Sequence, residues 1–159
     1  MLSPPRSLRT LRLNMKFVAD VMLGRLARFL RFRGYDVEYD HRATDEELLL
    51  KSRRRIVLTK DLPLASRIKD GRVYLVEETG AEKQFAEILC QFPQSFPGTS
   101  RAIRCLVCNS KIKRIAKRKI EHLVPPFIFR RFSEFYFCAN CRRIYWPGSH
   151  YERMYRMIK

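Results

Sequence analysis

Three aspartates stand where a short apolar run gives way to a helical segment. Asp20 follows the run 16–19, Asp61 closely follows the run 56–59, and Asp45 opens a segment with capping-box spacing. If the runs are parallel strands, these carboxylates gather at the carboxyl edge of one sheet, where ligands bind in open α/β sheets. They would repel one another there unless cations bound between them. Carboxylate oxygens suit Mg²⁺ or Mn²⁺, ions that hold a phosphodiester and activate water.

Each aspartate also has a purely structural interpretation. Asp45 can complement a helix dipole, a contribution of about 0.3–1 kcal/mol. Asp20 and Asp61 both precede helical segments, so either can be an N-cap. The spacing alone leaves both interpretations open.

The elements that must position these acids follow from apolar periodicity. Strands are expected over 16–19, 35–39, 56–59 and 72–76, separated by helical patterns. Gly34 is expected to close the first helix, Thr44 and Glu47 to cap the second, and Pro63 to stand in the first turn of the third. A last helix is expected over 81–92. This alternation predicts an α/β fold with a mainly parallel sheet flanked by helices.

Four of the five cysteines form two C-x-x-C pairs, which predicts a tetrahedral zinc site built from Cys105, Cys108, Cys138 and Cys141. The 29 residues between the pairs should contain their own structure. A disulfide framework and a redox-active pair are less favoured, because no export segment is evident and neither pair opens a helix of a βαβ unit. Cys90, inside an apolar run, is expected to be a packed thiol, and His122 would be a ligand only if a cysteine were displaced.

The charge of the chain predicts a polyanionic partner. The 159 residues carry 33 Lys plus Arg and 16 Asp plus Glu, a net charge of +17. Residues 1–99 have a net charge of +5 and residues 100–159 one of +12, with a Pro/Gly/Ser-rich stretch between them. An apolar fraction of 46% excludes a wholly disordered chain, and no run approaches the ~20 apolar residues of a membrane span.

A dense basic run lies between the cysteine pairs and is followed by aromatic residues interleaved with Arg130 and Arg131. The basic ones are expected to contact RNA phosphates, and they are Lys111, Lys113, Arg114, Lys117, Arg118, Lys119, Arg130 and Arg131. The aromatic ones can stack on unpaired bases, although we favour a role in the small core, and they are Phe127, Phe129, Phe132, Phe135, Tyr136 and Phe137.

Several longer motifs carry a family resemblance. The runs VADVMLGRLARFLRFRGYDVEYD, TDEELL, LTKDLPLA, RCLVCN, VPPF, EFYFCANC and YWPGSHYERM resemble the Mut-seven C-terminal RNase domain family over roughly residues 15–155. The resemblance implies a PIN-like nuclease fold joined to a Cys₄ zinc ribbon, with family acids at Asp20, Asp45 and Asp61. Glu77 and Glu78 are candidates for a fourth acid. In the closing motif we interpret His150 as a packing or capping residue.

These observations lead to one organisation and function. We expect a disordered basic extension over 1–14, a PIN-like domain over 15–92, a linker over 93–100 and a zinc ribbon over 101–159. The expected activity is metal-dependent, endonucleolytic hydrolysis of RNA, with structural Zn²⁺, catalytic Mg²⁺ or Mn²⁺, a cytoplasmic location and no membrane partner. The alternatives are a non-catalytic module that binds RNA or a ribonucleoprotein, and a nuclease that acts on DNA.

Overall fold

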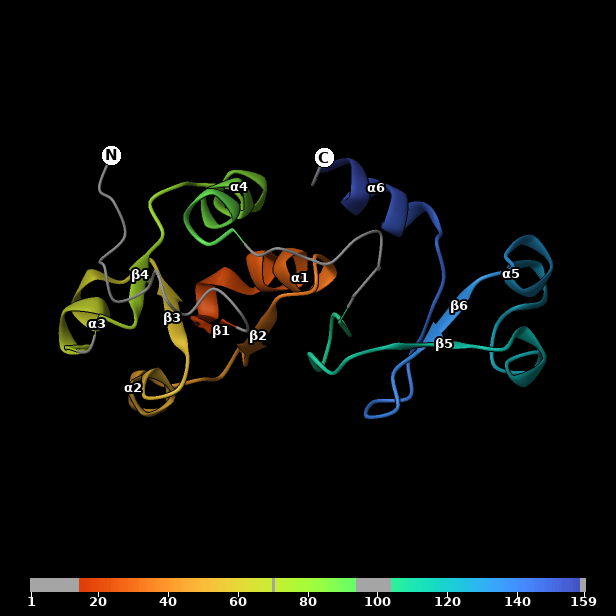
Figure 1. The fold of residues 1–159 in the computed structure, drawn as a ribbon, viewed down its shortest axis with the longest axis horizontal. Helices are drawn as coiled ribbons and strands as arrows, with labels where there is room; N and C mark the ends of the chain where they lie inside the picture. The colour runs from red at the N-terminus through yellow and green to blue at the C-terminus, as the bar shows by residue number, and fades with distance from the viewer. Residues whose placement is uncertain (1–14, 70, 94–103, 158–159) are drawn as a thin grey trace.

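The computed structural model describes residues 15–69, 71–93 and 104–157. The predictions made for residues 1–14 and for nearly all of 93–100 lie outside these residues. Within them the chain forms two units, each with its own sheet (Figure 1).

The first unit, residues 15–93, contains a four-stranded parallel sheet. Its strands are β1 (Lys16–Ala19), β2 (Asp36–Tyr39), β3 (Ile56–Thr59) and β4 (Val73–Leu75). They lie in the order β2-β1-β3-β4, and every neighbouring pair is parallel. The predicted mainly parallel sheet is confirmed.

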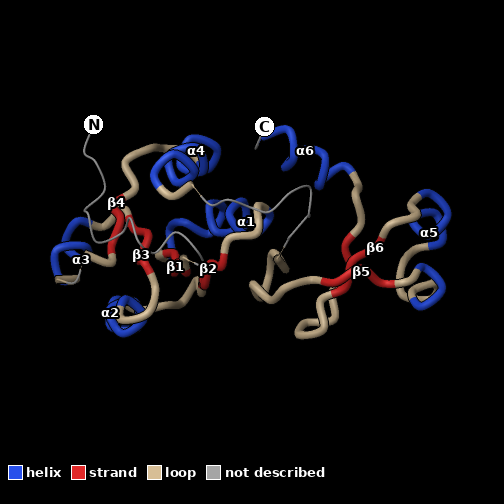
Figure 2. The backbone as a smooth tube through the Cα atoms, in the orientation of Figure 1, coloured by secondary structure: helices blue, strands red, loops and turns tan. Residues whose placement is uncertain are grey.

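Helices cover both faces of this sheet (Figure 2). On one face lie α1 (Gly24–Phe32) and α4 (Ala81–Gln91), and on the other α2 (Asp45–Ser52) and α3 (Leu62–Arg67). A short 3₁₀ turn, η2 (Val21–Leu23), joins β1 to α1.

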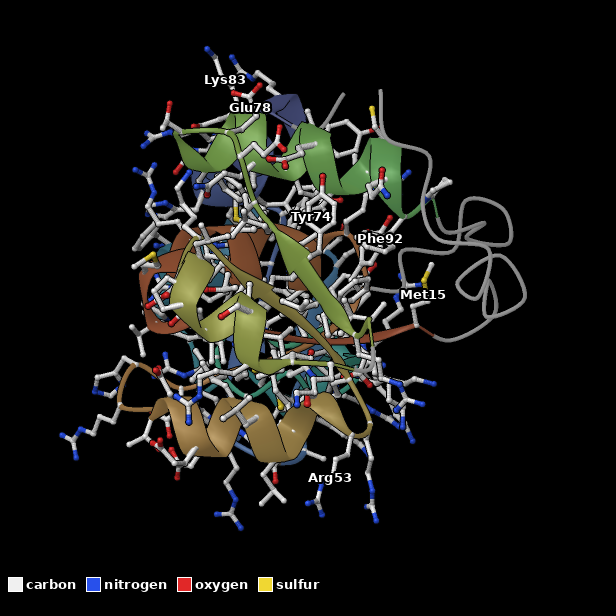
Figure 3. The ribbon with its side chains drawn as sticks, turned by 90° about the vertical axis from the view of Figure 1, so that its left-hand side faces the viewer. Met15, Arg53, Tyr74, Glu78, Lys83 and Phe92 are labelled. Atoms are coloured by element: carbon white, nitrogen blue, oxygen red, sulfur yellow. The ribbon has the colours of Figure 1, made fainter. Side chains whose placement is uncertain are left out.

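Successive side chains of β1 point into two different apolar cores, one on each face of the sheet. Phe17 and Ala19 pack toward α1 and α4, whereas Val18 packs toward α2 and α3. Tyr74 and Phe92 meet edge to face with ring centroids 5.3 Å apart between β4 and the end of α4 (Figure 3). Burial on both faces explains why the two central strands, β1 and β3, are the apolar runs of the sequence.

The helix ends follow the local sequence. Gly34 closes α1 with a φ of 95°, a conformation that side chains other than glycine rarely adopt. Thr44 and Glu47 form the predicted capping box, and Pro63 stands in the first turn of α3. The prediction for Cys90 is wrong: its side chain is exposed, because the buried positions of α4 recur at 81, 84, 85 and 88 and leave residue 90 outside that stripe.

The second unit, residues 104–157, is a small ribbon. It contains β5 (Lys113–Ile115), η3 (Lys117–Lys119), α5 (Pro126–Arg131), β6 (Phe135–Phe137) and β7 (Ile144–Tyr145), with an antiparallel sheet in the order β5-β6-β7. Most of these elements fall between the two cysteine pairs, as expected. Their core is small and consists of Ile120, Val124, Ile128 and Phe135.

The final helix, α6 (Ser149–Met157), returns from the ribbon toward the first unit. The ring of Tyr151 meets that of Phe32 edge to face at 5.0 Å, and Met154 packs on the core beneath α1.

A buried arginine joins the two units at β2. Arg31, which is 3% exposed, donates to the carbonyls of Val37, Leu106 and Val107 at 2.8, 2.9 and 3.1 Å. The two ribbon acceptors are the middle residues of the first C-x-x-C turn. A guanidinium of the first unit is therefore satisfied by the backbone of the cysteine turn.

Asp36 is the second polar contact between the units. Its carboxylate accepts from Arg55 at 2.7 Å and Asn109 at 2.8 Å, and it pairs with Arg104 at 3.2 Å. The amide oxygen of Asn109 also accepts from the backbone N–H of Val37 at 3.0 Å, which covers the edge of the sheet. Burial raises the pKa of Asp36, but the hydrogen bonds from Arg55 and Asn109 outweigh it and hold the pKa below its ordinary value.

Candidate functional site

The strand order forms a topological switch point between β1 and β3. The chain leaves β1 toward β2 on one side and later returns to β3 and β4 on the other, so the connections diverge between these central strands. In open α/β sheets, such a switch point forms a crevice beyond the carboxyl ends of the strands. Asp20 follows β1 at this edge, and Thr59 ends β3 beside it.

Asp20 is buried and held firmly. Its backbone N–H donates to the carbonyl of Leu58 at 2.9 Å, its Oδ1 accepts from Val21 N–H at 2.5 Å, and its Oδ2 accepts from the hydroxyl of Thr59 at 2.6 Å. Only 5% of the residue is exposed. Both oxygens keep further acceptor capacity, because an ionised carboxylate offers about four lone-pair sites.

Asp61 belongs to the same arrangement through Thr59. Its backbone N–H donates to Thr59 Oγ1 at 2.9 Å, and its Oδ1 accepts from Leu64 N–H at 3.0 Å as the N-cap of α3. This cap bond does not use Oδ2. The N-cap interpretation is therefore correct, and it is compatible with metal binding because capping uses only one oxygen.

Thr59 is the site residue that the sequence analysis missed. It is fully buried, yet it links Asp20 to the backbone of Asp61. The available clue was a hydroxyl residue at the end of an otherwise apolar strand, two positions before an aspartate.

Asp45 is held apart from this arrangement. It is the first residue of α2, and its Oδ2 pairs with Arg67 of α3 at 3.4 Å. Arg67 also pairs with Glu46 at 3.2 Å. Across residues 15–69, 71–93 and 104–157, the four cysteines are the only group of three or more Cys, His, Asp or Glu residues whose ligand atoms lie within 4.8 Å of one another. The structure thus links Asp20 and Asp61 through Thr59, whereas Asp45 forms an ion pair with Arg67.

The loop after β4 is fixed beside Asp61 by two charged residues. Lys60 donates to the carbonyls of Glu77 and Glu78 at 3.0 and 2.8 Å. The carboxylate of Glu87 accepts from the backbone N–H groups of the same two residues at 2.9 and 3.0 Å. The side chains of Glu77 and Glu78 are exposed, so a role as a fourth acid stays a prediction.

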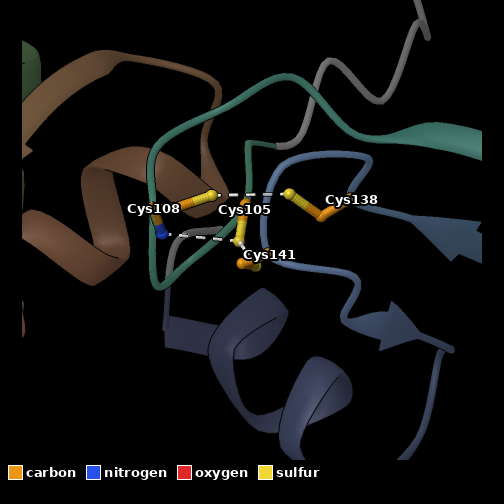
Figure 4. A group of neighbouring side chains, drawn as sticks. All are labelled: Cys105, Cys108, Cys138 and Cys141. Atoms are coloured by element: carbon orange, nitrogen blue, oxygen red, sulfur yellow. Dashed lines mark hydrogen bonds between the residues drawn. The ribbon is translucent and has the colours of Figure 1, made fainter.

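The second candidate site is formed by the four cysteines. Cys105 Sγ lies 3.4 Å from Cys141 Sγ, and Cys108 Sγ lies 3.4 Å from Cys138 Sγ (Figure 4). A tetrahedral site with Zn–S bonds of 2.3 Å would have sulfur atoms about 3.8 Å apart. The observed spacing therefore fits a structural zinc ion, as the C-x-x-C pairs predicted.

The two cysteine turns have the same backbone design. Asn109 N–H donates to the carbonyl of Cys105 at 2.9 Å, and Arg142 N–H donates to that of Cys138 at 2.8 Å. Asn109 and Arg142, each directly after its second cysteine, have φ angles of 65° and 58°. Two turns of this kind present four thiols to a common centre.

The thiols have very different proton affinities without a cation. Burial raises the pKa of Cys141 to about 12 and also raises that of Cys138. In Cys108 burial acts in the same direction, but hydrogen bonds involving Asn140 and Ser110 outweigh it and lower the pKa to about 5. The hydroxyl of Tyr145 lies 3.0 Å from Cys105 Sγ. Since zinc ligands are thiolates, holding all four deprotonated requires the charge of a metal.

The proposed RNA-contacting residues lie on the outside of the ribbon. Arg130 and Arg131 are exposed, as are all members of the basic run except the half-buried Lys117, which stacks over the ring of Phe129 at 4.6 Å. Among the aromatic residues, Phe135 is fully buried whereas Phe127 is 61% exposed. The core interpretation thus holds for Phe135 and fails for Phe127.

Comparison with known protein families settles the relationship of the chain. The model of the Mut7-C RNase domain matches residues 15–158, which include both sheets, the aspartates and all four clustered cysteines. The chain belongs to the Mut7-C RNase domain family. No curated protein and no solved structure matches it.

Membership in the Mut7-C family gives the class of activity. A family of RNase domains implies a ribonuclease whose substrate is RNA. The match also shows that the parallel sheet and the ribbon are parts of one Mut7-C unit. No helix in the described part of this Mut7-C chain is long and apolar enough to cross a membrane.

Proposed function

We propose that the protein is a metal-dependent ribonuclease that cuts RNA internally at the switch point between β1 and β3. The observation that carries this proposal is the arrangement of Asp20 and Asp61 around Thr59. Two carboxylates beyond the ends of adjacent central strands form the kind of oxygen-rich edge that binds Mg²⁺ or Mn²⁺.

Asp20, Asp61 and Asp45 would hold the ion, which when bound supplies charge to a phosphodiester and lowers the pKa of a water molecule. Thr59 orients Asp20, and the N-cap bond of Asp61 fixes its carboxylate. Asp45 must exchange Arg67 for the metal, a modest rearrangement because the ion pair is half exposed. The released guanidinium would then be free to meet a phosphate.

The ribbon would bind the RNA strand. Its exposed basic run and Arg130 and Arg131 offer charge without a competing acidic cluster, since residues 100–159 contain only three acids. Arg31 and Asp36 fix the ribbon to β2, the strand next to β1, so the ribbon and the aspartates belong to one connected body that would act on the same RNA strand.

One observation favours the second candidate, a non-catalytic RNA-binding module. Arg67 neutralises Asp45 and Glu46, and a binder has no need of three converging carboxylates. Under this alternative the acids serve only as helix caps.

The experiment is an incubation of the zinc-loaded chain with end-labelled single-stranded RNA, an RNA hairpin and single-stranded DNA, with and without Mn²⁺. The proposal expects internal RNA fragments only when the metal is added. Binding of RNA without any cleavage in Mg²⁺ or Mn²⁺ supports the non-catalytic module, and preferential cutting of DNA overturns the assignment of RNA as substrate.

A further inference from the structure

A cavity of about 490 Å³ lies between the ribbon sheet, α5 and α6, away from the aspartates. Its volume falls within the range of ligand pockets, about 300–1,000 Å³. The lining is rich in aromatic rings from both units, namely Phe32, Phe127, Phe132, Tyr136, Tyr145, Trp146 and Tyr151. Phe32 is buried and Phe127 is exposed, whereas the other five are half buried, so each of these five keeps some exposed surface.

The ribbon core and Gly148 hold Trp146 in place. It packs against the ribbon core, and its indole lies against Gly148, where an added Cβ would stand 2.9 Å from Nε1. The N–H of Gly148 also donates to the carbonyl of Trp146 at 2.9 Å. Glycine therefore permits a tight turn around the ring, and the ring forms a rigid wall of the cavity.

Polar side chains also line this aromatic cavity, including Arg131, Glu152 and His150. His150, which was expected to be a packing or capping residue, is exposed near the start of α6, so it does not pack in a core. A second, open hollow adjoins the Trp146 segment, and its lining includes Arg28, Arg142 and Arg143 among mostly apolar residues. The two hollows share Trp146 and three further residues, so an aromatic pocket adjoins an arginine-lined groove.

We propose that the cavity binds one unpaired nucleobase of the RNA, stacked on Trp146, while the neighbouring phosphates follow the arginine-lined groove. This inference rests on the proposed function for its choice of RNA. A purely apolar ligand would explain the aromatic rings but not the arginines, and RNA supplies both a flat base and a charged backbone. Arg28 comes from α1, the helix that follows Asp20 and η2, so the groove extends from the ribbon to the unit that carries the aspartates.

The test uses the fact that Trp146 is the only tryptophan of the chain. Zinc-loaded wild-type protein without added Mg²⁺ or Mn²⁺ is titrated with a uridine 12-mer and with an abasic 12-mer of equal charge. The uridine strand should quench the tryptophan fluorescence and bind at least about fivefold more tightly than the abasic strand, because one stacked base contributes that much affinity.

Variants assign the effect to the cavity, with RNA binding followed by anisotropy of a labelled strand. Trp146→Ala should weaken binding at least about fivefold, and Trp146→Phe should restore most of it because the ring face is retained. Arg131→Ala should weaken binding more than Arg153→Ala, which removes the same charge from an exposed position of α6 outside the cavity.

Equal affinity for the uridine and abasic strands, with no quenching, overturns the inference even if Trp146→Ala fails to fold. Quenching by an apolar dye that RNA does not displace also overturns it, in favour of an apolar ligand. Because no cleavage is measured, an inactive enzyme that still shows base-dependent quenching disproves the proposed nuclease and leaves the nucleobase pocket standing.

Discussion

The hydroxyl of Thr59 donates to Asp20 Oδ2 at 2.6 Å, inside a site where Thr59 is fully buried and Asp20 nearly so. The same oxygen of Thr59 accepts the backbone N–H of Asp61 at 2.9 Å. One side chain thus links the carboxylate of Asp20, which follows β1, to the backbone of Asp61, which follows β3.

Replacing that hydroxyl should destabilise the fold. Thr59→Val keeps the shape but leaves the N–H of Asp61 without its acceptor, so unfolding in urea should show a loss of about 1–3 kcal/mol. Thr59→Ser keeps the hydroxyl and should lose less. Equal stability of the wild type and Thr59→Val would show that the bond does not hold the site.

Arg67 competes with metal for Asp45. Arg67→Ala should lower the concentration of Mn²⁺ that gives half-maximal cleavage by up to about fivefold, the range expected for an exposed ion pair. Arg54→Ala removes the same charge from an exposed position near the end of α2 and should change it little. If both variants reached half-maximal cleavage at a lower Mn²⁺ concentration than wild type, the cause would be a general change in charge rather than release of Asp45.

The cysteine cluster should hold one zinc ion per chain. Native mass spectrometry should detect it, and Cys138→Ser should lose it, with loss of the near-ultraviolet circular dichroism of Trp146, because the small ribbon core cannot replace binding energy on the order of 10 kcal/mol. Cys90→Ser is the matched control, since Cys90 is exposed and outside the cluster. Retention of zinc by Cys138→Ser would contradict the four-cysteine site.

Because of Asp36, the free energy of unfolding should decrease as the pH falls into the acidic range. Its pKa is lower in the folded chain than its unfolded value of about 3.9. Its contribution is therefore present above that value and disappears as the pH falls through the folded pKa. The difference in unfolding free energy between wild type and Asp36→Asn should be constant at pH 5–7 and shrink below about pH 4. A difference that persists to pH 2 would mean that charge at Asp36 is unimportant.

Local chemistry made much of the fold predictable. The apolar runs of β1 and β3, the capping box at Thr44 and the glycine at 34 each act over a few residues, and the sequence displays them directly. The four cysteines were predictable for the same reason, since each pair is a single turn.

The remaining contacts join residues far apart in the chain. In the sequence Thr59 is an ordinary β-branched strand residue, and its role depends on the pairing of β1 with β3. Arg31 has the spacing of an exposed basic helix face, but the ribbon covers it in the folded chain. The Asp45–Arg67 pair spans 22 residues and two helices. Such partners are chosen by tertiary packing, which periodicity does not reveal.

The proposed function requires that the aspartates bind the metal that supports RNA cleavage. The most direct measurement compares single-turnover cleavage of a labelled single-stranded RNA by zinc-loaded wild type and Asp20→Asn across a titration of Mn²⁺, with zinc content and RNA affinity measured on the same samples. We expect no cleavage without Mn²⁺, saturable cleavage by wild type, and a rate at least about 100-fold lower for Asp20→Asn with zinc and RNA binding retained. Equal rates for the two proteins, or cleavage that is independent of Mn²⁺ and Mg²⁺, would contradict it.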